Sequence, residues 1–358
     1  MTAANDSTRV LRRVPPRPRI LIVALDNLGD LVFASALPPA IRARYPDATI
    51  GLWCKAYTSP IAPLIPNVDW VAAADPFWDG APGHPSGSTA LFIRALRAVS
   101  GQRFDVALLA SPQWRVAAAV AAARIPIRIG QQRSHNRHFL TTVLPPADRD
   151  RPVVSDLGSL LAPIDATSSS LATGLNPAPL ADRTRALRDA LGPGPVAAIN
   201  PFVTLSPVGI PLDRWVGVAR ALVVRGYTVA WLGTRTQLAT FHQAVPLEPG
   251  WRSAIDLIPD GTLVSAAALL AAADVYLGCD SGPLHLSAAL AVPVVGVFPA
   301  VSKLPRFTPQ GRGHWSVVTP TAGTTDITVE QILAALDLLP PPHRGVHFTG
   351  DLHLHSGI

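Results

Sequence analysis

The sequence predicts an α/β protein built from two similar halves. Short continuous apolar runs, of the kind found in parallel strands buried on both faces, alternate with helical patterns along the chain. This alternation stops at residues 165–179, a segment rich in Ser, Thr, Pro and Ala, and then resumes. A chain of 358 residues is long enough for two domains with large cores.

The first half opens with the apolar run RILIVAL at residues 19–25, which predicts a buried strand. A turn containing glycine follows at residues 26–30, and a helical pattern then extends to Arg44. The later elements alternate in the same way. We expect strands at 48–53, 104–110 and 125–130, and an Ala-rich helix at 113–124.

The second half repeats this order. We expect strands at 196–200, 227–232, 275–278 and 293–298, and helices at 213–225, 263–273, 283–290 and 329–339. Thr328 and Gln331 have the spacing of a capping box at the start of the last helix. Ligands of open α/β sheets bind beyond the carboxyl ends of the strands, so the loops after strands are where chemistry is expected.

Composition and charge narrow the classes of function. Hydrophobic residues make up 48% of the chain, which excludes wholesale disorder, and the net charge of +6 suits an anionic small molecule or a membrane surface as well as nucleic acid. The sequence shows no nucleic-acid motif and no apolar stretch of membrane-spanning length. Residues 1–19 lack the apolar core of a signal peptide, so we expect none there. The only cysteines, Cys54 and Cys279, predict no disulfide framework and suit a reducing cytoplasm.

The first candidate site is the segment DNLGD at residues 26–30, directly after the first strand. Gly29 allows the backbone to turn and to approach a ligand closely. A carboxylate on Asp30 at this position can act as a general base. The alternative is that Asp26 or Asp30 only caps the following helix.

The second candidate is GCDSGPLH at residues 278–285. Asp280 or Ser281 can cap a helix that has Pro283 at its first position. The backbone N–H groups of Ser281, Gly282 and the first turn then form a site for phosphate. The alternative is an ordinary helix start in which His285 is a core residue.

A third feature is a stretch without acidic residues at 106–147 that carries five arginines and two histidines. It suits an anionic acceptor, although a solvated basic surface is the alternative. Two further patterns suggest metals. Asp148 and Asp150 have Asp-x-Asp spacing but lie in a loop rich in Pro and Arg, and His353 and His355 have no evident third ligand.

Taken in order, the two motifs resemble glycosyltransferase family 9, the ADP-heptose:lipopolysaccharide heptosyltransferases. Residues 19–45 are similar to the family's opening strand and Gly-Asp segment, and residues 273–298 are similar to its Asp-Ser/Thr-Gly-x-x-His helix start. Residues 306–311 resemble the loop that follows. The resemblance implies a GT-B architecture, in which two Rossmann-like domains with parallel sheets face each other across a cleft.

Under this resemblance, residues 19–170 form the acceptor domain and residues 171–340 the nucleotide-sugar domain, with tails at 1–18 (disordered and basic) and 341–358 (flexible). Asp30 is expected to be the general base of an inverting, metal-independent transfer from an ADP-heptose-like donor. No cofactor is expected. The expected donor-binding residues are Thr204, Ser206, Asp280, Ser281, Gly282, His285, Lys303 and Arg306, and the expected acceptor-binding residues are Asn27, Gly29, Arg133 and Arg137.

The chain departs from the family pattern at two positions. Val208 stands where relatives carry a phosphate-binding lysine, so that Lys303 or Arg306 would have to supply the charge. Arg235 occupies the region where relatives place a ribose-binding glutamate. These departures leave the donor nucleotide open.

Three alternatives remain beside the heptosyltransferase. The first is a sugar-nucleotide binder or epimerase of the same fold that transfers nothing. The second is a metal-dependent transferase built on Asp148 and Asp150. The third keeps the transferase but gives it a specialised acceptor in place of the lipopolysaccharide inner core. We expect a cytoplasmic protein that can also bind peripherally to the inner membrane face.

Overall fold

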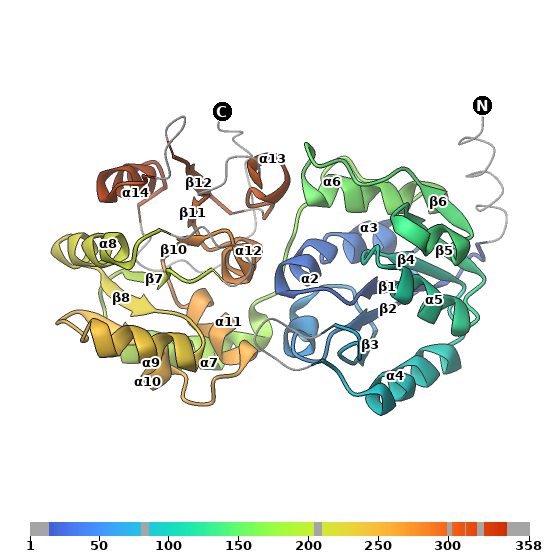
Figure 1. Ribbon diagram of the computed structural model, residues 1–358, viewed down its shortest axis with the longest axis horizontal. Coiled ribbons are helices and arrows are strands. Elements are labelled where there is room, and N and C mark those ends of the chain that lie inside the picture. Colours follow the sequence, from blue (N-terminus) through green and yellow to red (C-terminus); the bar gives the residue numbers. More distant parts are fainter. Residues whose placement is uncertain are drawn as a thin grey trace.

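The computed structural model contains two six-stranded parallel sheets with helices packed on either side, one sheet in each half of the chain (Figure 1). It describes residues 14–79, 86–203, 210–298, 303–311, 313–320 and 326–341. Several residues given roles above lie outside these ranges: Thr204, Ser206, Val208, His353 and His355. Most of the expected N-terminal tail and nearly all of the C-terminal tail also lie outside them.

The first sheet has the strand order β3-β2-β1-β4-β5-β6. Its strands are β1 (Arg19–Ala24), β2 (Thr49–Cys54), β3 (Trp70–Ala73), β4 (Val106–Leu109), β5 (Ile127–Gln131) and β6 (Thr142–Leu144). Its α-helices are α2 (Leu28–Ala34), α3 (Leu37–Arg44), α4 (Thr89–Gly101), α5 (Trp114–Ala122) and α6 (Val153–Gly158). The 3₁₀ helices are η1 (Ser59–Leu64), η2 (Ser134–His138) and η3 (Ser159–Ile164).

The second sheet has the order β12-β11-β10-β7-β8-β9. Its strands are β7 (Val196–Asn200), β8 (Thr228–Trp231), β9 (Trp251–Ser253), β10 (Val275–Cys279), β11 (Val294–Val297) and β12 (Trp315–Val318). Its helices are η4 (Ala178–Leu180), α7 (Ala181–Leu191), α8 (Leu212–Val224), α9 (Arg235–Ala244), α10 (Ala254–Leu257), α11 (Leu263–Ala271), α12 (Gly282–Ala289), α13 (Leu304–Phe307) and α14 (Val329–Asp337).

Both sheets have the same doubly wound topology. Counted from the first strand of each half, the order is 3-2-1-4-5-6, as in dinucleotide-binding folds. The direction of winding reverses between β1 and β4 in the first sheet and between β7 and β10 in the second. Loops at such a switch point diverge and leave a crevice. The two candidate motifs follow β1 and β10, so each lies at the switch point of its own sheet.

The core of each sheet consists of strands buried on both faces, which explains their continuous apolar sequences. We expect Leu277→Ala, at the fully buried centre of β10, to lower the free energy of unfolding by about 2–5 kcal/mol through the cavity it leaves. The matched control is Leu338→Ala, which removes a side chain that is 81% exposed and should cost less than about 0.5 kcal/mol. Urea denaturation followed by tryptophan fluorescence compares the two variants. Equal losses would contradict the assigned core.

The segment after β1 differs from its prediction. Gly29 lies inside α2 and not in a turn, and the expected continuous helical pattern is divided into α2 and α3. The division falls at Ser35 and Ala36, just before two prolines in the first turn of α3, where a missing N–H is tolerated. The capping box at the start of α14 is confirmed by reciprocal bonds of 2.9 and 3.3 Å between Thr328 and Gln331.

The segment at residues 165–179 passes between the halves and bonds to both. The N–H of Gly174 donates to Ser35 Oγ in the first half at 3.3 Å, and the N–H of Leu175 donates to the carbonyl of Ala289 in the second half at 2.9 Å. In the part of the chain that the structure describes, no helix is long and apolar enough to cross a membrane.

Candidate active site

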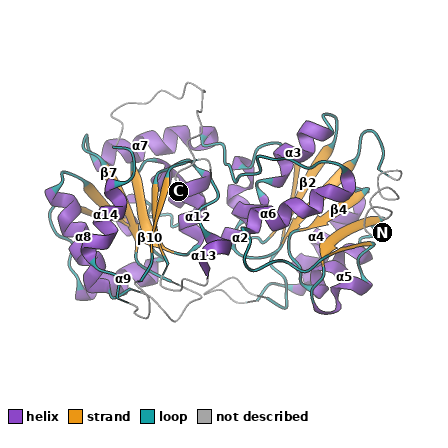
Figure 2. Cartoon of the chain, turned by 90° about the horizontal axis from the view of Figure 1, so that it is seen from above, coloured by secondary structure: helices purple, strands orange, loops and turns teal. Residues whose placement is uncertain are grey.

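Two helices bring the candidate motifs together at the boundary between the halves. Helix α2 carries Asp30, α12 begins at Gly282, and the two helices face each other in both views of the chain (Figures 1 and 2). A Cβ atom added to Gly29 would lie 3.3 Å from Cδ2 of His285, and one added to Gly282 would lie 3.0 Å from the side chain of Leu28. Both glycines therefore allow close helix packing, which corrects the expectation that Gly29 serves a turn.

A cavity of about 550 Å³ opens beside this contact. Asp26 and Asp30 line it from the first half, and Arg306 and Phe307 of α13 line it from the second. Its wall carries both charge signs: Asp156 adds a third carboxylate, and Arg133 and Arg149 add two further guanidinium groups. A cavity of this size, with polar groups from both halves, suits a ligand such as a sugar that carries anionic groups.

Asp30 has the properties of a base at this position. Its carboxylate accepts a hydrogen bond of 3.1 Å from the backbone N–H of Asn27, so it also caps α2, and the capping interpretation holds together with the functional one. Asp30 is exposed at the surface, but protein atoms packed around its carboxylate reduce the hydration of that group. This desolvation, reinforced by the charge of Asp26, raises the pKa of Asp30 to about 6. A carboxylate with this pKa is ionised at pH 7 and can still accept a proton.

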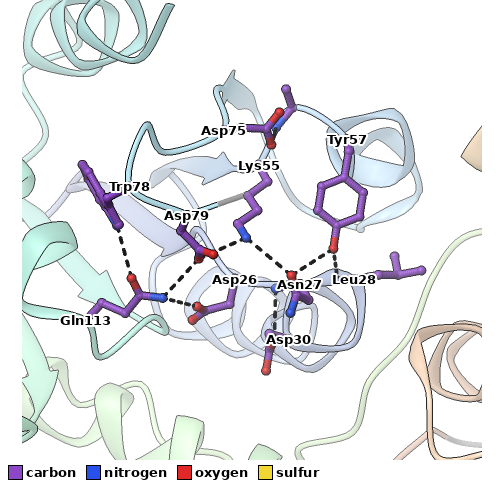
Figure 3. A network of polar contacts seen from close by, with 11 residues as sticks. Asp26, Asn27, Leu28, Asp30, Lys55, Tyr57, Asp75, Trp78, Asp79 and Gln113 are labelled. Atoms are coloured by element: carbon purple, nitrogen blue, oxygen red, sulfur yellow. Dashed lines mark hydrogen bonds and ion pairs between the residues drawn. The ribbon is translucent and has the colours of Figure 1, made fainter. Parts of the chain in front are cut away.

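Asp26 belongs to a polar network behind Asp30, which Figure 3 shows. Gln113 donates to Oδ1 of Asp26 at 2.9 Å, and burial raises the pKa of Asp26. Lys55, whose side chain is only 1% exposed, contacts Asp79 Oδ2 at 3.2 Å and Asn27 Oδ1 at 3.4 Å. The chain therefore holds a buried lysine and two carboxylates directly behind its candidate base.

The N-terminus of α12 lies at the same boundary. Ser281 occupies the N-cap position, but its Oγ donates to the carbonyl of Cys279 at 3.1 Å and does not cap the helix. Ser281, Gly282 and Pro283 are partly exposed. Among the described residues, none accepts a hydrogen bond from the N–H of Ser281 or Gly282. Because these donors lie at the positive end of the helix dipole, they can bind an anion.

Asp280 contacts two side chains that we expected to bind the donor, His285 and Lys303. His285 Nε2 lies 3.3 Å from Oδ1 of Asp280, and Lys303 Nζ lies 3.6 Å from Oδ2. His285 is 5% exposed and packs against the ring of Phe33 in α2, with centroids 4.6 Å apart. His285 is thus a buried residue of the interface that orients Asp280, while Lys303 is more exposed and neutralises the Asp280 charge.

Arg306, which we expected at the donor, contacts two residues of the first half. Its guanidinium forms an ion pair of 2.6 Å with Asp156 and donates to the carbonyl of Asp148 at 2.7 Å. Both partners belong to the first half, so Arg306 connects the two halves across the cavity. Both bonds come from Nη1 of Arg306.

Other expected residues lie in different surroundings. Arg133 lines the cavity, whereas Arg137 is exposed on η2 and is not among the described lining residues. The side-chain oxygen of Asn27 already accepts from Lys55 and Tyr57. Arg235 at the start of α9 donates to the carbonyl of Pro259 at 2.8 Å.

No role was predicted for Lys55, Gln113, Asp156 or Phe307. Two of these residues could have been predicted as site residues from their positions in the sequence. Lys55 directly follows β2, and Gln113 lies in the loop after β4. Both strands pair with β1, and ligands bind beyond the carboxyl ends of such strands. Within the described ranges, no three His, Cys, Asp or Glu side chains gather where they could hold a metal ion. Asp148 bonds instead to the neighbouring backbone N–H of Asp150 at 3.0 Å.

Comparison with known proteins decides the family. Residues 92–318, more than half of the chain, match the model of glycosyltransferase family 9 (heptosyltransferase). The chain belongs to glycosyltransferase family 9. It is therefore a glycosyltransferase enzyme, as the resemblance implied.

Individual family 9 proteins agree with this assignment. Lipopolysaccharide heptosyltransferase 3 of Escherichia coli is 23% identical over 295 residues, covering 77% of this chain and 82% of that one. Lipopolysaccharide heptosyltransferase 2 of Salmonella typhimurium is 24% identical over 315 residues, covering 81% and 85%.

Solved structures confirm the GT-B fold. ADP-heptose lipopolysaccharide heptosyltransferase II of Escherichia coli superposes with a TM-score of 0.73 at 20% identity, covering 89% of this chain and 97% of that one. Escherichia coli heptosyltransferase WaaC with ADP superposes with a TM-score of 0.70 at 16% identity, covering 89% and 99%. WaaC has also been solved with ADP-2-deoxy-2-fluoro heptose.

Proposed function

We propose that this family 9 enzyme transfers a heptose, or a related sugar, from an ADP-sugar to a hydroxyl group of an acceptor. The observation that carries the proposal is the contact between α2 and α12. It brings Asp30 from one half to the same boundary as two backbone N–H groups from the other half, for which the described residues offer no acceptor, and Asp30 also lines a cavity. The related structures with ADP and with an ADP-heptose analogue support the choice of donor.

In the proposed mechanism the donor diphosphate binds at the N-terminus of α12. The N–H groups of Ser281 and Gly282 and the ammonium of Lys303 stabilise the charge that develops as ADP leaves. His285 holds Asp280 in place. Fixed donors of this kind supply the stabilisation that a metal would otherwise give, so we propose transfer without a metal.

Asp30 accepts the proton of the acceptor hydroxyl as its oxygen attacks the anomeric carbon. The attack comes from the face opposite the departing ADP, so the sugar configuration is inverted. The proton passes to the carboxylate, and the electron pair of the broken glycosidic bond passes to the ADP phosphate oxygen. Arg133 and Arg149 on the cavity wall suit an acceptor with phosphate or carboxylate groups, such as the lipopolysaccharide inner core. The unpaired cysteines, Cys54 and Cys279, suit a cytoplasmic location.

A donor panel tests the proposal. The enzyme is incubated with ADP-heptose, ADP-glucose or UDP-glucose and deacylated, heptose-free lipopolysaccharide, and release of nucleoside diphosphate is measured with and without EDTA. We expect release from ADP-heptose that depends on the acceptor and is unchanged by EDTA, with an inverted anomeric configuration by NMR. A preference for UDP-glucose would contradict the proposed donor. Loss of activity with EDTA would contradict the proposed mechanism.

A further inference from the structure

The two lysines of the chain have an unusual placement. Of 30 basic residues, 28 are arginine, and the only lysines are Lys55 and Lys303. Both lie at the boundary described above, Lys55 behind Asp30 and Lys303 beside Asp280. Lys303 has a role in the proposed function, whereas Lys55 has none. A buried ammonium is costly to desolvate unless it is well paired, so its position needs an explanation.

The contacts of Lys55 lead to the candidate base through one residue. Lys55 Nζ contacts Oδ1 of Asn27 at 3.4 Å, and the backbone N–H of Asn27 donates to Oδ2 of Asp30 at 3.1 Å (Figure 3). Tyr57 contacts the same Oδ1 at 3.4 Å and accepts from the N–H of Leu28 at 2.8 Å. The loop that presents Asp30 is therefore tied to the end of β2 by two side chains.

Asp26 belongs to the same polar network as Lys55. Gln113 links Asp26 to Asp79 by donating to both, at 2.9 and 3.5 Å, and Asp79 pairs with Lys55 at 3.2 Å. Trp78 fixes the amide of Gln113 from its other side through a bond of 3.3 Å. Lys55 thus forms an ion pair with Asp79, which fixes its position. Its positive charge also favours ionisation of Asp26 and Asp30, which both line the cavity.

We propose that Lys55 is a positioning residue for Asp30: it holds Asn27, whose backbone N–H binds the Asp30 carboxylate, and it supplies the buried positive charge that faces the Asp26–Asp30 pair. This inference rests on the proposed function, because it takes Asp30 as the general base. Asp26 and Lys55 act on Asp30 in opposite directions: the carboxylate disfavours ionisation of Asp30, and the lysine favours it.

The other charged groups around Asp30 lie on separate elements and stay unchanged in the test. Arg306 of α13 favours its ionisation, and His285 of α12 packs against α2. Arg133, Arg149 and Asp156 also line the cavity. A change made only at Asp26 or Lys55 therefore reports on the network behind the base.

Titration of the Asp30 carboxyl by NMR tests the proposal on the full chain without substrate. Protein labelled with ¹³C at the aspartate carboxyl carbons is titrated from pH 4 to pH 9, and the Asp30 resonance is identified by its loss in Asp30→Asn. We expect a wild-type midpoint near a pKa of about 6. Asp26→Asn should lower this midpoint, and Lys55→Met should raise it by a smaller amount, because Lys55 influences Asp30 less than Asp26 does. Arg44→Met, which removes an exposed ion pair with Asp165 elsewhere in the same half, should leave it in place.

Opposite shifts in the two variants support the proposal. An Asp30 midpoint within about 0.3 of the wild type in Lys55→Met, even with a lower melting temperature, would assign Lys55 a purely structural role and overturn the proposal. The double variant Lys55→Met/Asp79→Asn removes the carboxylate that pairs directly with Lys55 together with the lysine, and it replaces the single variant if that does not fold. The proposed function fails separately, if Asp30→Asn keeps wild-type transfer.

Discussion

Replacing Asp30 by asparagine is expected to lower kcat by about 10²- to 10⁴-fold, the usual contribution of a general base. Asparagine keeps an oxygen that can accept the N–H of Asn27, so the cap of α2 survives while the ability to take up a proton is lost. The affinity for ADP, measured by isothermal titration calorimetry, should be unchanged because we propose that the other half binds the nucleotide. Asp47→Asn, at an exposed position of the same half, is the matched control and should keep wild-type activity.

The pH dependence of activity and of stability also tests the role of Asp30. Because Asp30 must be ionised to accept a proton, wild-type activity should fall as the pH drops through about 6. The raised pKa also means that ionising Asp30 disfavours folding, since the unfolded chain ionises near 3.8. The contribution of Asp30 to the free energy of unfolding is therefore fully present below about pH 3.8 and is lost as the pH rises through about 6. Asp30→Asn should therefore not lower the melting temperature at pH 8. An inactive variant that also melts early would indicate a structural role.

Replacing Lys303 by methionine is expected to weaken ADP binding by about 10-fold or more, in the range of a lost charge-assisted contact. The reason lies in Asp280, whose carboxylate sits at the same helix N-terminus where the diphosphate is expected. Lys303, 3.6 Å from it, neutralises that charge, and removing the ammonium leaves Asp280 to repel the ligand.

Isothermal titration with ADP measures this effect directly. Arg185→Met on α7, which breaks an exposed ion pair with Asp182 in the same half, serves as the control and should bind ADP as the wild type does. If Lys303→Met bound ADP normally, the charge that Val208 fails to supply would have to come from another residue.

The fold could be predicted because each central strand is a continuous apolar run that can be recognised from its own sequence. The strand at residues 196–200 has the bounds of β7, and the strand expected at 275–278 is one residue shorter than β10. The missed strands β3, β6, β9 and β12 lie at or near sheet edges and have only three or four residues. Helix α7 was missed as well, because its sequence ADRTRALRDAL buries only Leu187 and Leu191.

The candidate site could be predicted only where its residues belong to local motifs. Asp30 and Ser281 follow strands in recognisable segments, so their approximate places were evident. The residues that surround Asp30 could not be predicted in this way, because Lys55 reaches Asn27 only when β2 pairs with β1 in parallel. Arg306 and Asp156 are 150 residues apart and meet only through the packing of the two halves. Contacts of this kind follow from tertiary structure and leave no pattern in the sequence.

The most direct test of the account is a crystal structure of the enzyme with ADP-2-deoxy-2-fluoro heptose, the analogue bound in the WaaC structure. The account predicts the diphosphate within hydrogen-bond distance of the N–H groups of Ser281 and Gly282, and the anomeric carbon turned toward the cavity that holds Asp30. A nucleotide bound away from the start of α12, or a sugar separated from Asp30 by protein, would contradict it.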